Sequence, residues 1–464
     1  MAKSLESRFE RYCDVMVGAL SHADREVPAR WYLKGLMLPG GRKSVEPMAA
    51  RVHPEDVRSA HQSMHHLVAD ADWSDAALLS AVAGEVLPVL TQSGKKPCVW
   101  IIDDTGFPKH GTHSVGVARQ DCGQRGKTDN CQVAVSLSLA TAAGSLPLAY
   151  RLYLPQDWAD DTARRQKVGV PPALSFATKG EIAFLQIEAA LASGMARGPL
   201  LAAAGYGDET ALRERLSARG IPYAVGVRPA TTVGWGEHPP APALPGRGRP
   251  RTRLLRDAPH QPIGVLELAR ALPTKSFRPV TWREGTAQAL SSRFARVRVA
   301  AAHGNRVREA EWLIIEWPRN EADPTHYWLS TLPEAMSFKE LVAIVKARWM
   351  IERDDQELKQ EVGLGHYEGR NWRGFHHHAS LCIAANGFFM LERVSGAKKN
   401  AARLKTPPIP DGFRPRGAGP HAAAHSLVDR HHTLPPRQGH RQKPSSVPLL
   451  RQSIRAGTDH LLTQ

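Results

Sequence analysis

Cysteine and long apolar runs are both scarce in this sequence of 464 residues. Its five cysteines are odd in number and scattered, and none forms a CxxC pair, which argues against a disulfide framework and against a zinc ribbon. No run of about 18 apolar residues occurs, so no membrane-spanning helix is predicted. The first residues are polar and lack the apolar core of a signal peptide. We therefore expect a reduced, cytoplasmic protein.

Acidic residues are outnumbered by basic ones, with 45 Asp and Glu against 61 Lys and Arg and a formal net charge of +16. Such an excess favours a polyanionic partner, bound through phosphate contacts and counterion release. From Val394 to the end, 12 Lys and Arg stand against 3 Asp, so over half of the excess lies in the tail. Because many basic proteins bind no nucleic acid, charge alone leaves both interpretations open.

The length predicts two to four domains rather than one core. Residues 1–95 carry amphipathic helical spacing and predict a helical domain, which either packs on the core or binds DNA ends. Residues 96–228 begin with short strands and continue with alternating strands and helices, which is typical of a mixed α/β core.

The second half of the chain changes in texture. Residues 229–325 predict a β-rich insertion, with a linker at 238–251 that is rich in Pro, Gly and Arg. Residues 326–395 complete the core, with a long helix over 338–362 and another over 378–392. Residues 396–464 are basic and poorly periodic, so we expect a flexible tail.

Two adjacent aspartates follow the first apolar run of the core. Cys98–Ile102 is typical of a buried strand, and Asp103 and Asp104 come directly after it. A carboxylate held at a strand end can coordinate a divalent cation at a fixed point. An Asp-rich turn has the same composition, so this motif alone does not establish a metal site.

A charged helix near residue 350 is the second motif. Its polar side chains recur at spacings of three and four and therefore line one face, namely Arg348, Glu352, Asp355, Gln356 and Lys359. Such a stripe is usually a solvated, ion-paired face. Its other use is to supply one metal-binding carboxylate between cations that grip phosphates, and this helix alone does not separate the two hypotheses.

Histidines also cluster, as the run His376–His378 and as the pair His110 and His113. Histidine is a common metal ligand, so both groups invite that interpretation. On helix and loop surfaces, however, such histidines are more often solvated. We assign them no ligand role.

Together, the aspartate pair and the charged helix resemble those of the DDE-class transposases of bacterial insertion sequences, in the cut-and-paste group with a β-rich insertion before the final glutamate. The likeness runs from about residue 5 to 393. Arg348–Glu352 with Leu358 and Lys359 is similar to the signature helix of the group. Other segments that resemble the group are Ile102–Gly111, Gly116–Gln120, Asn130–Ser136, Trp282–Thr286 and Tyr327–Ser330.

The resemblance implies an α/β fold with an RNase H-like mixed sheet, a helical N-terminal domain and a β-rich insertion. It implies that Asp103 and Glu352 are catalytic metal ligands, and that Arg348 and Lys359 contact DNA phosphates. The pattern of the group, Asp, any residue, then a small hydroxyl residue, favours Asp103 over Asp104 as the ligand. Asp104 then tunes the site. Val345 stands where the group often has a tyrosine, so no tyrosine contact to DNA is expected.

The second aspartate of the group is missing. Where the group has Ala-Asp-Ala-Gly-Tyr-Gly, this chain has Ala-Ala-Ala-Gly-Tyr-Gly over 202–207, which puts Ala203 at the lost catalytic position. Asp208 is a possible substitute only if the turn folds back toward the site. The group uses two Mg²⁺ or Mn²⁺ ions, bridged by its three carboxylates. Losing one carboxylate costs metal affinity and roughly a thousandfold or more in rate.

We therefore expect an insertion-sequence transposase that binds terminal inverted repeats and target sites in double-stranded DNA. We expect it to act as a homodimer on DNA and to have no membrane partner. Its place would be the bacterial cytoplasm, in association with the nucleoid. Metal-dependent strand cleavage and transfer would be impaired by Ala203. The main alternative is a catalytically silent DNA-binding protein derived from a transposase. A metal-independent hydrolase with paired carboxylates is a third hypothesis.

Overall fold

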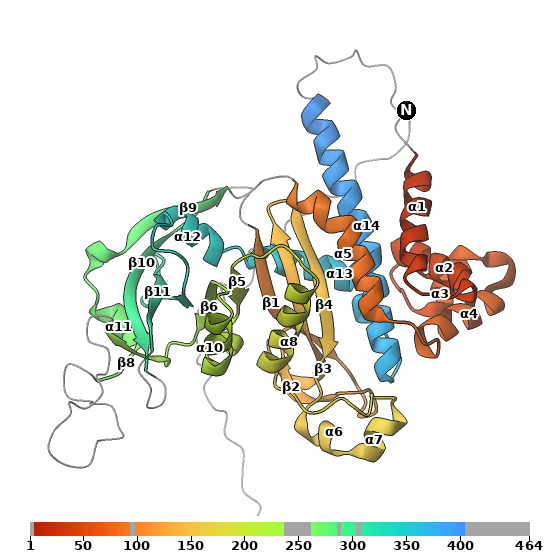
Figure 1. Cartoon of the computed structure of the whole chain (residues 1–464), viewed down its shortest axis with the longest axis horizontal. Coiled ribbons are helices and arrows are strands. Elements are labelled where there is room, and N and C mark those ends of the chain that lie inside the picture. Colours follow the sequence, from red (N-terminus) through yellow and green to blue (C-terminus); the bar gives the residue numbers. More distant parts are fainter. Residues whose placement is uncertain (1–3, 93–97, 236–260, 285–288, 303–307, 404–464) are drawn as a thin grey trace, which may run out of the picture. The chain divides into compact units, whose positions relative to one another are not determined.

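The computed structural model describes residues 4–92, 98–235, 261–284, 289–302 and 308–403 (Figure 1). The linker predicted at 238–251 and most of the predicted tail at 396–464 lie outside these residues. Within the described ranges, no helix combines the length and the apolar character that crossing a membrane requires.

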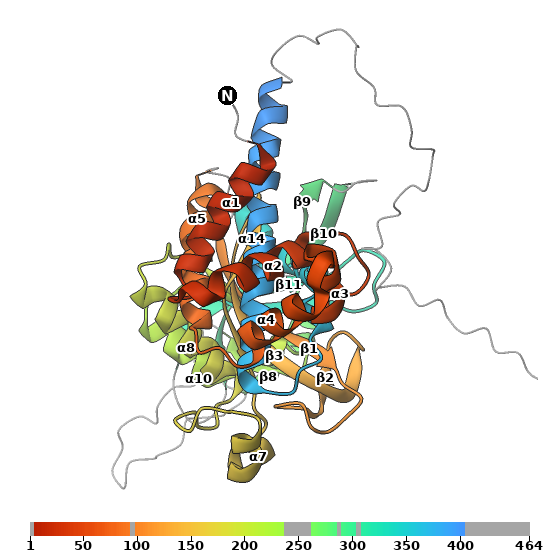
Figure 2. The ribbon, with the colours of Figure 1, turned by 90° about the vertical axis from the view of Figure 1, so that its right-hand side faces the viewer.

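Helices dominate the start of the described chain, as predicted. They are α1 (Leu5–Gly18), α2 (Glu26–Met37), α3 (Val45–Val52), α4 (Val57–Ala69) and α5 (Asp75–Thr91). The side chains of Ser4, Asp56 and Ser74 cap α1, α4 and α5 by accepting a hydrogen bond from a backbone N–H three residues on. Helices α1, α2, α4 and α5 all contact α14 (Trp372–Arg403), the long helix at the end of the described chain (Figure 2).

The strands of the core form one mixed sheet. They are β1 (Val99–Pro108), β2 (Ala118–Cys122), β3 (Lys127–Thr141), β4 (Gly144–Leu152), β5 (Leu200–Ala202) and β6 (Tyr223–Val227). Strand β3 pairs antiparallel with β1, β2 and β4, whereas β5 lies parallel to β1, and β6 parallel to β5. The resulting order β4-β3-β1-β5-β6 is that of an RNase H-like core. The predicted fold class is confirmed.

The β-rich segment extends this same sheet. Its strands are β7 (Thr232–Trp235), β8 (Ile263–Gly264), β9 (Arg278–Glu284), β10 (Ala289–Ala301) and β11 (Ala310–Glu316), with α11 (Val265–Ala271) after β8. The next strand, β12 (His326–Ser330), lies in the stretch predicted to complete the core. Strand β12 pairs with β6 and with β11, and β11 pairs in turn with β10. The insertion is therefore hydrogen-bonded to the core, and its predicted β character is confirmed.

Helices cover both faces of the sheet. One face carries α8 (Lys179–Ala192) and α10 (Thr210–Ala218), and the other carries α12 (Phe338–Val345) and α13 (Trp349–Gln360). The short helices α6 (Gln156–Asp160), α7 (Thr162–Lys167) and α9 (Ala204–Gly207) connect strands and helices of the core. Trp100 and Ile102 of β1 pack in the cluster that contains α8, whereas Val99 and Ile101 pack in the cluster that contains α12 and α13. Because side chains alternate along a strand, Asp103 belongs to the α13 face and Asp104 to the α8 face.

Three predicted elements were wrong in extent. The helix predicted over 378–392 is α14, which runs from residue 372 to residue 403. Strand β1 runs on through both aspartates to Pro108, because β3 pairs with its whole length. The helix predicted over 338–362 is two helices, with residues 346–348 between them. Helix α12 contacts β9 while α13 contacts β3 and β4, so the break lets one apolar stretch cover two parts of the sheet.

Candidate active site

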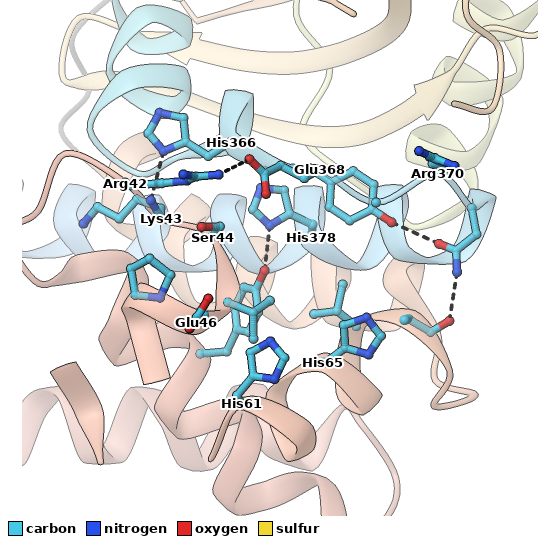
Figure 3. A pocket seen from close by; sticks show the side chains of 18 of the residues that line it. Arg42, Lys43, Ser44, Glu46, His61, His65, His366, Glu368, Arg370 and His378 are labelled. Carbon is cyan, nitrogen blue, oxygen red and sulfur yellow. Dashed lines mark hydrogen bonds and ion pairs between the residues drawn. The ribbon is translucent and has the colours of Figure 1, made fainter. Parts of the chain in front are cut away.

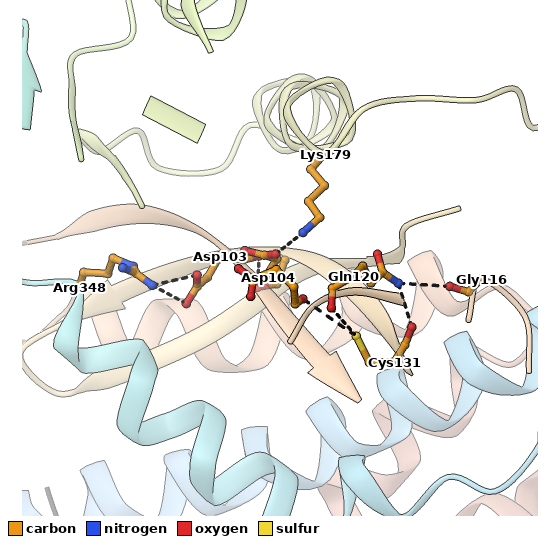
Figure 4. A network of polar contacts seen from close by, with 9 residues as sticks. Asp103, Asp104, Gly116, Gln120, Cys131, Lys179 and Arg348 are labelled. Carbon is orange, nitrogen blue, oxygen red and sulfur yellow. Dashed lines mark hydrogen bonds and ion pairs between the residues drawn. The ribbon is translucent and has the colours of Figure 1, made fainter. Parts of the chain in front are cut away.

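Asp103 lies in the middle of β1 and is bound by Arg348. One guanidinium nitrogen, Nη2, donates to both carboxylate oxygens at 3.0 and 3.1 Å (Figure 4). The Asp103 side chain is only 16% exposed. Burial raises the pKa of Asp103 to about 6; Arg348 opposes this rise, while Asp355 and Asp104 add to it. The carboxylate is therefore costly to keep charged without a cation beside it.

Glu352 reaches the same guanidinium from the first turn of α13. Its Oε1 lies 3.9 Å from Nη2 of Arg348, and its side chain is 60% exposed. Asp103 and Glu352 thus both lie within 4 Å of one nitrogen. The structure brings these two predicted carboxylates together across Arg348.

Arg348 has spare hydrogen-bonding capacity. Its pKa is lowered by burial and raised by Asp103 and Glu352, with a net increase, so the guanidinium stays charged. Its Nε is buried and finds no acceptor among the described residues. An anion could accept a hydrogen bond from this nitrogen only after the Arg348 side chain moved, because Nε is buried.

Asp104 faces the opposite layer, as Figure 4 shows. Its Oδ2 accepts from Nζ of Lys179 at 2.5 Å. Lys179 is the first residue of α8, which begins at a capping box formed by Thr178 and Glu181. The geometry therefore places Asp103, and not Asp104, on the side of Glu352.

Ala203 directly follows the end of β5, at the level of Asp103 on the neighbouring strand. Ile102 is opposite Ala202 in the parallel pair of β1 and β5, so the next positions, 103 and 203, are neighbours. The backbone at Ala203 is still extended, with φ −73° and ψ 170°. Since Leu201 packs in the α13-side cluster, alternation turns the methyl group of Ala203 to that side as well. A third carboxylate would meet Asp103 here, but the chain presents only a methyl group.

Asp208 is engaged elsewhere. Its Oδ1 accepts from the backbone N of Arg228 at 3.1 Å and from the hydroxyl of Thr231 at 2.7 Å, and its Oδ2 pairs with the Arg228 side chain. These contacts hold the loop that follows β6. None of the contacts described for Asp208 joins it to Asp103 or Glu352.

Two aspartates of α13, Asp354 and Asp355, tie this helix to the sheet. Thr105 donates its hydroxyl hydrogen to Oδ2 of Asp355 at 2.6 Å, and Nζ of Lys359 lies 3.6 Å from the same oxygen. Asp354 is buried and accepts from both the backbone N and the hydroxyl of Ser145. These roles were not predicted from the sequence. The hydroxyl of Thr105 was a usable signal, because residues two positions apart on a strand share one face and Thr105 follows Asp103 at that spacing.

The donor set determines which metal site is possible. Among the described residues, no group of three or more His, Cys, Asp or Glu side chains is arranged to hold a metal ion. Asp103 and Glu352 supply the oxygen donors that Mg²⁺ and Mn²⁺ prefer, although the Arg348 guanidinium lies between them. The residues present supply two oxygen ligands and lack the third ligand of a bridged pair of ions.

The histidine run 376–378 is buried, so the prediction that it is solvated was wrong. The three side chains lie on α14, which is enclosed by the N-terminal helices and by β4. His376 accepts from the backbone N of Leu152, and His378 Nδ1 lies 2.8 Å from the hydroxyl of Tyr32. His110 and His113 are exposed, as predicted.

Comparison with known proteins gives a family. The family model of the DDE superfamily endonucleases matches residues 15–289. The chain is also 31% identical over 147 residues to a probable transposase for insertion sequence element IS701 from Microchaete diplosiphon, a match that takes in 32% of this chain and 35% of that relative. A solved structure of the piggyBac transposase synaptic complex with hairpin DNA is similar at a TM-score of 0.40 and 10% identity, over 88% of this chain and 76% of that one.

The predicted relationship to DDE-class proteins is thus confirmed. The match to this chain covers about a third of the length of the curated relative. The match to the family model covers more than half of this sequence. On that match, the chain belongs to the DDE superfamily endonucleases.

Proposed function

We propose that this chain is an insertion-sequence transposase that binds the inverted-repeat ends of its element and whose strand cleavage and transfer are impaired. One observation carries the proposal. Asp103 and Glu352 converge on Arg348 at the level of the sheet where position 203 holds only a methyl group. The similarity to a probable insertion-sequence transposase supports the choice of double-stranded DNA as the substrate.

Asp103 and Glu352 would together hold a divalent ion, Mg²⁺ or Mn²⁺. When bound, such an ion activates an attacking oxygen and stabilises a leaving one in phosphoryl transfer. Without DNA, the single positive charge of Arg348 offsets part of the negative charge of the two carboxylates. A DNA phosphate competes for this guanidinium, because arginine binds phosphate in the same paired geometry as carboxylate. Arg348 then positions the phosphate and leaves Asp103 open to a cation.

Two carboxylates cannot balance two dications. The family arrangement needs a third, and Ala203 removes it. We expect a loss of roughly a thousandfold in cleavage rate, which corresponds to about 4 kcal/mol of barrier. DNA binding uses Arg348 and Lys359, which are intact, and so should persist. Joining two ends calls for two active sites, so we propose a homodimer on DNA, in the bacterial cytoplasm and associated with the nucleoid.

The test uses the full chain and a 40-bp duplex that carries the terminal repeat of its element, beside a scrambled duplex. We expect tighter binding to the repeat, and slow end cleavage in Mn²⁺ that disappears in Glu352→Gln. Equal binding to both duplexes would refute end recognition. Cleavage that persists in Glu352→Gln would refute the site.

The second candidate function is a catalytically silent DNA-binding protein. Ala203 and the pairing of Arg348 with Asp103 favour it, since a site neutralised from within needs no metal. Specific binding with no cleavage in Mn²⁺, even at high enzyme concentration, would select this candidate. Measurable cleavage would exclude it.

A further inference from the structure

Two adjoining cavities lie where the N-terminal helices meet the loop after α13. Their volumes are about 550 and 420 Å³, and both are lined by Arg42, His366, Tyr367, Glu368 and Arg370. The two cavities share these walls and are therefore adjacent, and we call the pair the basic groove. Most of its lining comes from four segments, 42–47, 61–70, 108–114 and 365–371, to which Tyr32 and His378 add. Figure 3 shows the cavity of about 550 Å³.

Two lysines of the groove are held rigidly. Nζ of Lys43 donates to the carbonyl oxygen of Leu36 at 2.8 Å, and Nζ of Lys109 donates to that of Tyr367 at 2.8 Å. Burial lowers the pKa of both lysines, and Arg51 lowers that of Lys43 further. The groove therefore holds positive charges that are partly desolvated and close to other cations. A bound anion would offset this cost.

Two arginines of the groove are available to a ligand. Arg370 is exposed, and its guanidinium forms no hydrogen bond or ion pair with any side chain in the part of the chain that the structure describes. Arg42 pairs with Glu368, but their side chains are 65% and 64% exposed. Such an exposed pair contributes little to stability, so a phosphate can displace the carboxylate. Glu46 and Asp70 also line the groove and oppose an anion, whereas His61 and His65 on α4 add donors.

The groove is aligned with the carboxylates of the candidate active site. Strand β1 runs from Asp103 to Pro108, and Pro108 lines the groove. Helix α13 is attached to this part of β1 by the hydrogen bond between Thr105 and Asp355. At about 3.3 Å per residue, five strand positions span about 17 Å. Duplex DNA rises about 3.4 Å per base pair, so this distance corresponds to about five base pairs.

We propose that the basic groove binds the phosphate backbone of the transposon-end duplex about five base pairs from the phosphate held near Asp103. This proposal rests on the proposed function, since it takes that duplex as the ligand. A continuous backbone suits the groove better than a single small anion, because its lysines and arginines come from three segments and lie along two cavities. Lys359, on the face of α13 between the two places, continues the same path.

Three variants of the full chain test the proposal by direct binding to a 30-bp duplex that carries the terminal repeat. Arg370→Ala and Arg42→Ala should weaken binding several-fold and lower the slope of log Kd against log salt by about 1 each. Glu368→Gln removes a carboxylate from the groove and should tighten binding. Arg215→Ala is the control, because Arg215 is an exposed arginine on α10, on the other face of the sheet. A merely structural role would not produce opposite signs for Arg370→Ala and Glu368→Gln.

Position along the DNA provides the second measurement. Single phosphates of the duplex are replaced by neutral methylphosphonates, one at a time. Replacement four to six positions from the cleaved bond should weaken binding by the unaltered chain and have little further effect on Arg370→Ala. Equal effects on both proteins at every position would overturn the groove assignment while leaving end binding intact. Failure of the unaltered chain to prefer the repeat would instead overturn the proposed function.

Discussion

Replacing Ala203 by aspartate is the sharpest test of the candidate site. The register of β1 and β5 puts position 203 beside Asp103, and neighbouring strands lie about 4.8 Å apart. Two carboxylates at about 5 Å repel each other by about 3 kcal/mol at an effective dielectric constant of about 20. Arg348 offsets part of this repulsion, so Ala203→Asp should lower the free energy of unfolding by about 1–3 kcal/mol without metal.

A divalent ion should reverse this loss. A divalent ion that binds the three carboxylates and is present at about 100 times its dissociation constant raises the free energy of unfolding by about 2.7 kcal/mol. We therefore expect Mg²⁺ or Mn²⁺ to raise the melting temperature of Ala203→Asp by several degrees, and that of the unaltered chain by much less. End cleavage in Mg²⁺ should rise about a thousandfold over the unaltered chain.

Ala203→Asn is the matched control, because asparagine has nearly the shape of aspartate but no charge. It should show neither the loss without metal nor the recovery with it. Calorimetry with and without Mg²⁺ measures both effects. If Ala203→Asp and Ala203→Asn melt alike under both conditions, position 203 does not face Asp103, and the account of the lost carboxylate fails.

Three further predictions concern stability. Gly207→Ala should lower the free energy of unfolding in urea by more than about 2 kcal/mol, because a Cβ there would collide with the carbonyl oxygen of Gly226. Gly205→Ala is the control, since a Cβ at that position has open space around it. Equal effects of the two substitutions would contradict the packing of α9 on β6. Burial lowers the pKa of His378 to about 4, below its unfolded value of about 6.5, so the unfolded chain binds the proton first as the pH falls. The free energy of unfolding should therefore fall by about 2 kcal/mol between pH 7 and pH 5. If His378→Gln showed the same dependence of unfolding free energy on pH, this reasoning would be refuted. The Arg283 guanidinium carbon lies 3.9 Å from the centre of the Trp349 ring. A double-mutant cycle on these two residues should therefore give a coupling free energy of about 0.5–1 kcal/mol. A coupling free energy of zero would mean that this contact does not join the insertion to α13.

Much of the core was predictable because its signals are local. Alternating and continuous apolar runs marked the strands now seen as β3, β5 and β6, and helical spacing marked the N-terminal helices. The gap at Ala203 was visible in a motif of six residues. The break between α12 and α13 was not, since no proline or glycine marks it and only packing on two parts of the sheet decides it.

The histidines show why local patterns were insufficient. Residues 376–378 are polar in sequence, yet each has a hydrogen-bond partner from far along the chain. Leu152 bonds His376, Val68 and Trp73 bond His377, and Tyr32 bonds His378. Burial without water is acceptable only because these partners exist, and no sequence window contains them.

By itself, the sequence determined which residue types are available: two carboxylates, the cations beside them, and a methyl group at 203. The tertiary structure decided their relations. It turned Asp103 toward Arg348 and Asp104 toward Lys179, and it assembled the basic groove from four separate segments. The physical reason is that backbone periodicity is set by neighbours in the chain, whereas charge pairing and desolvation depend on the register of the sheet and on the helices that cover it.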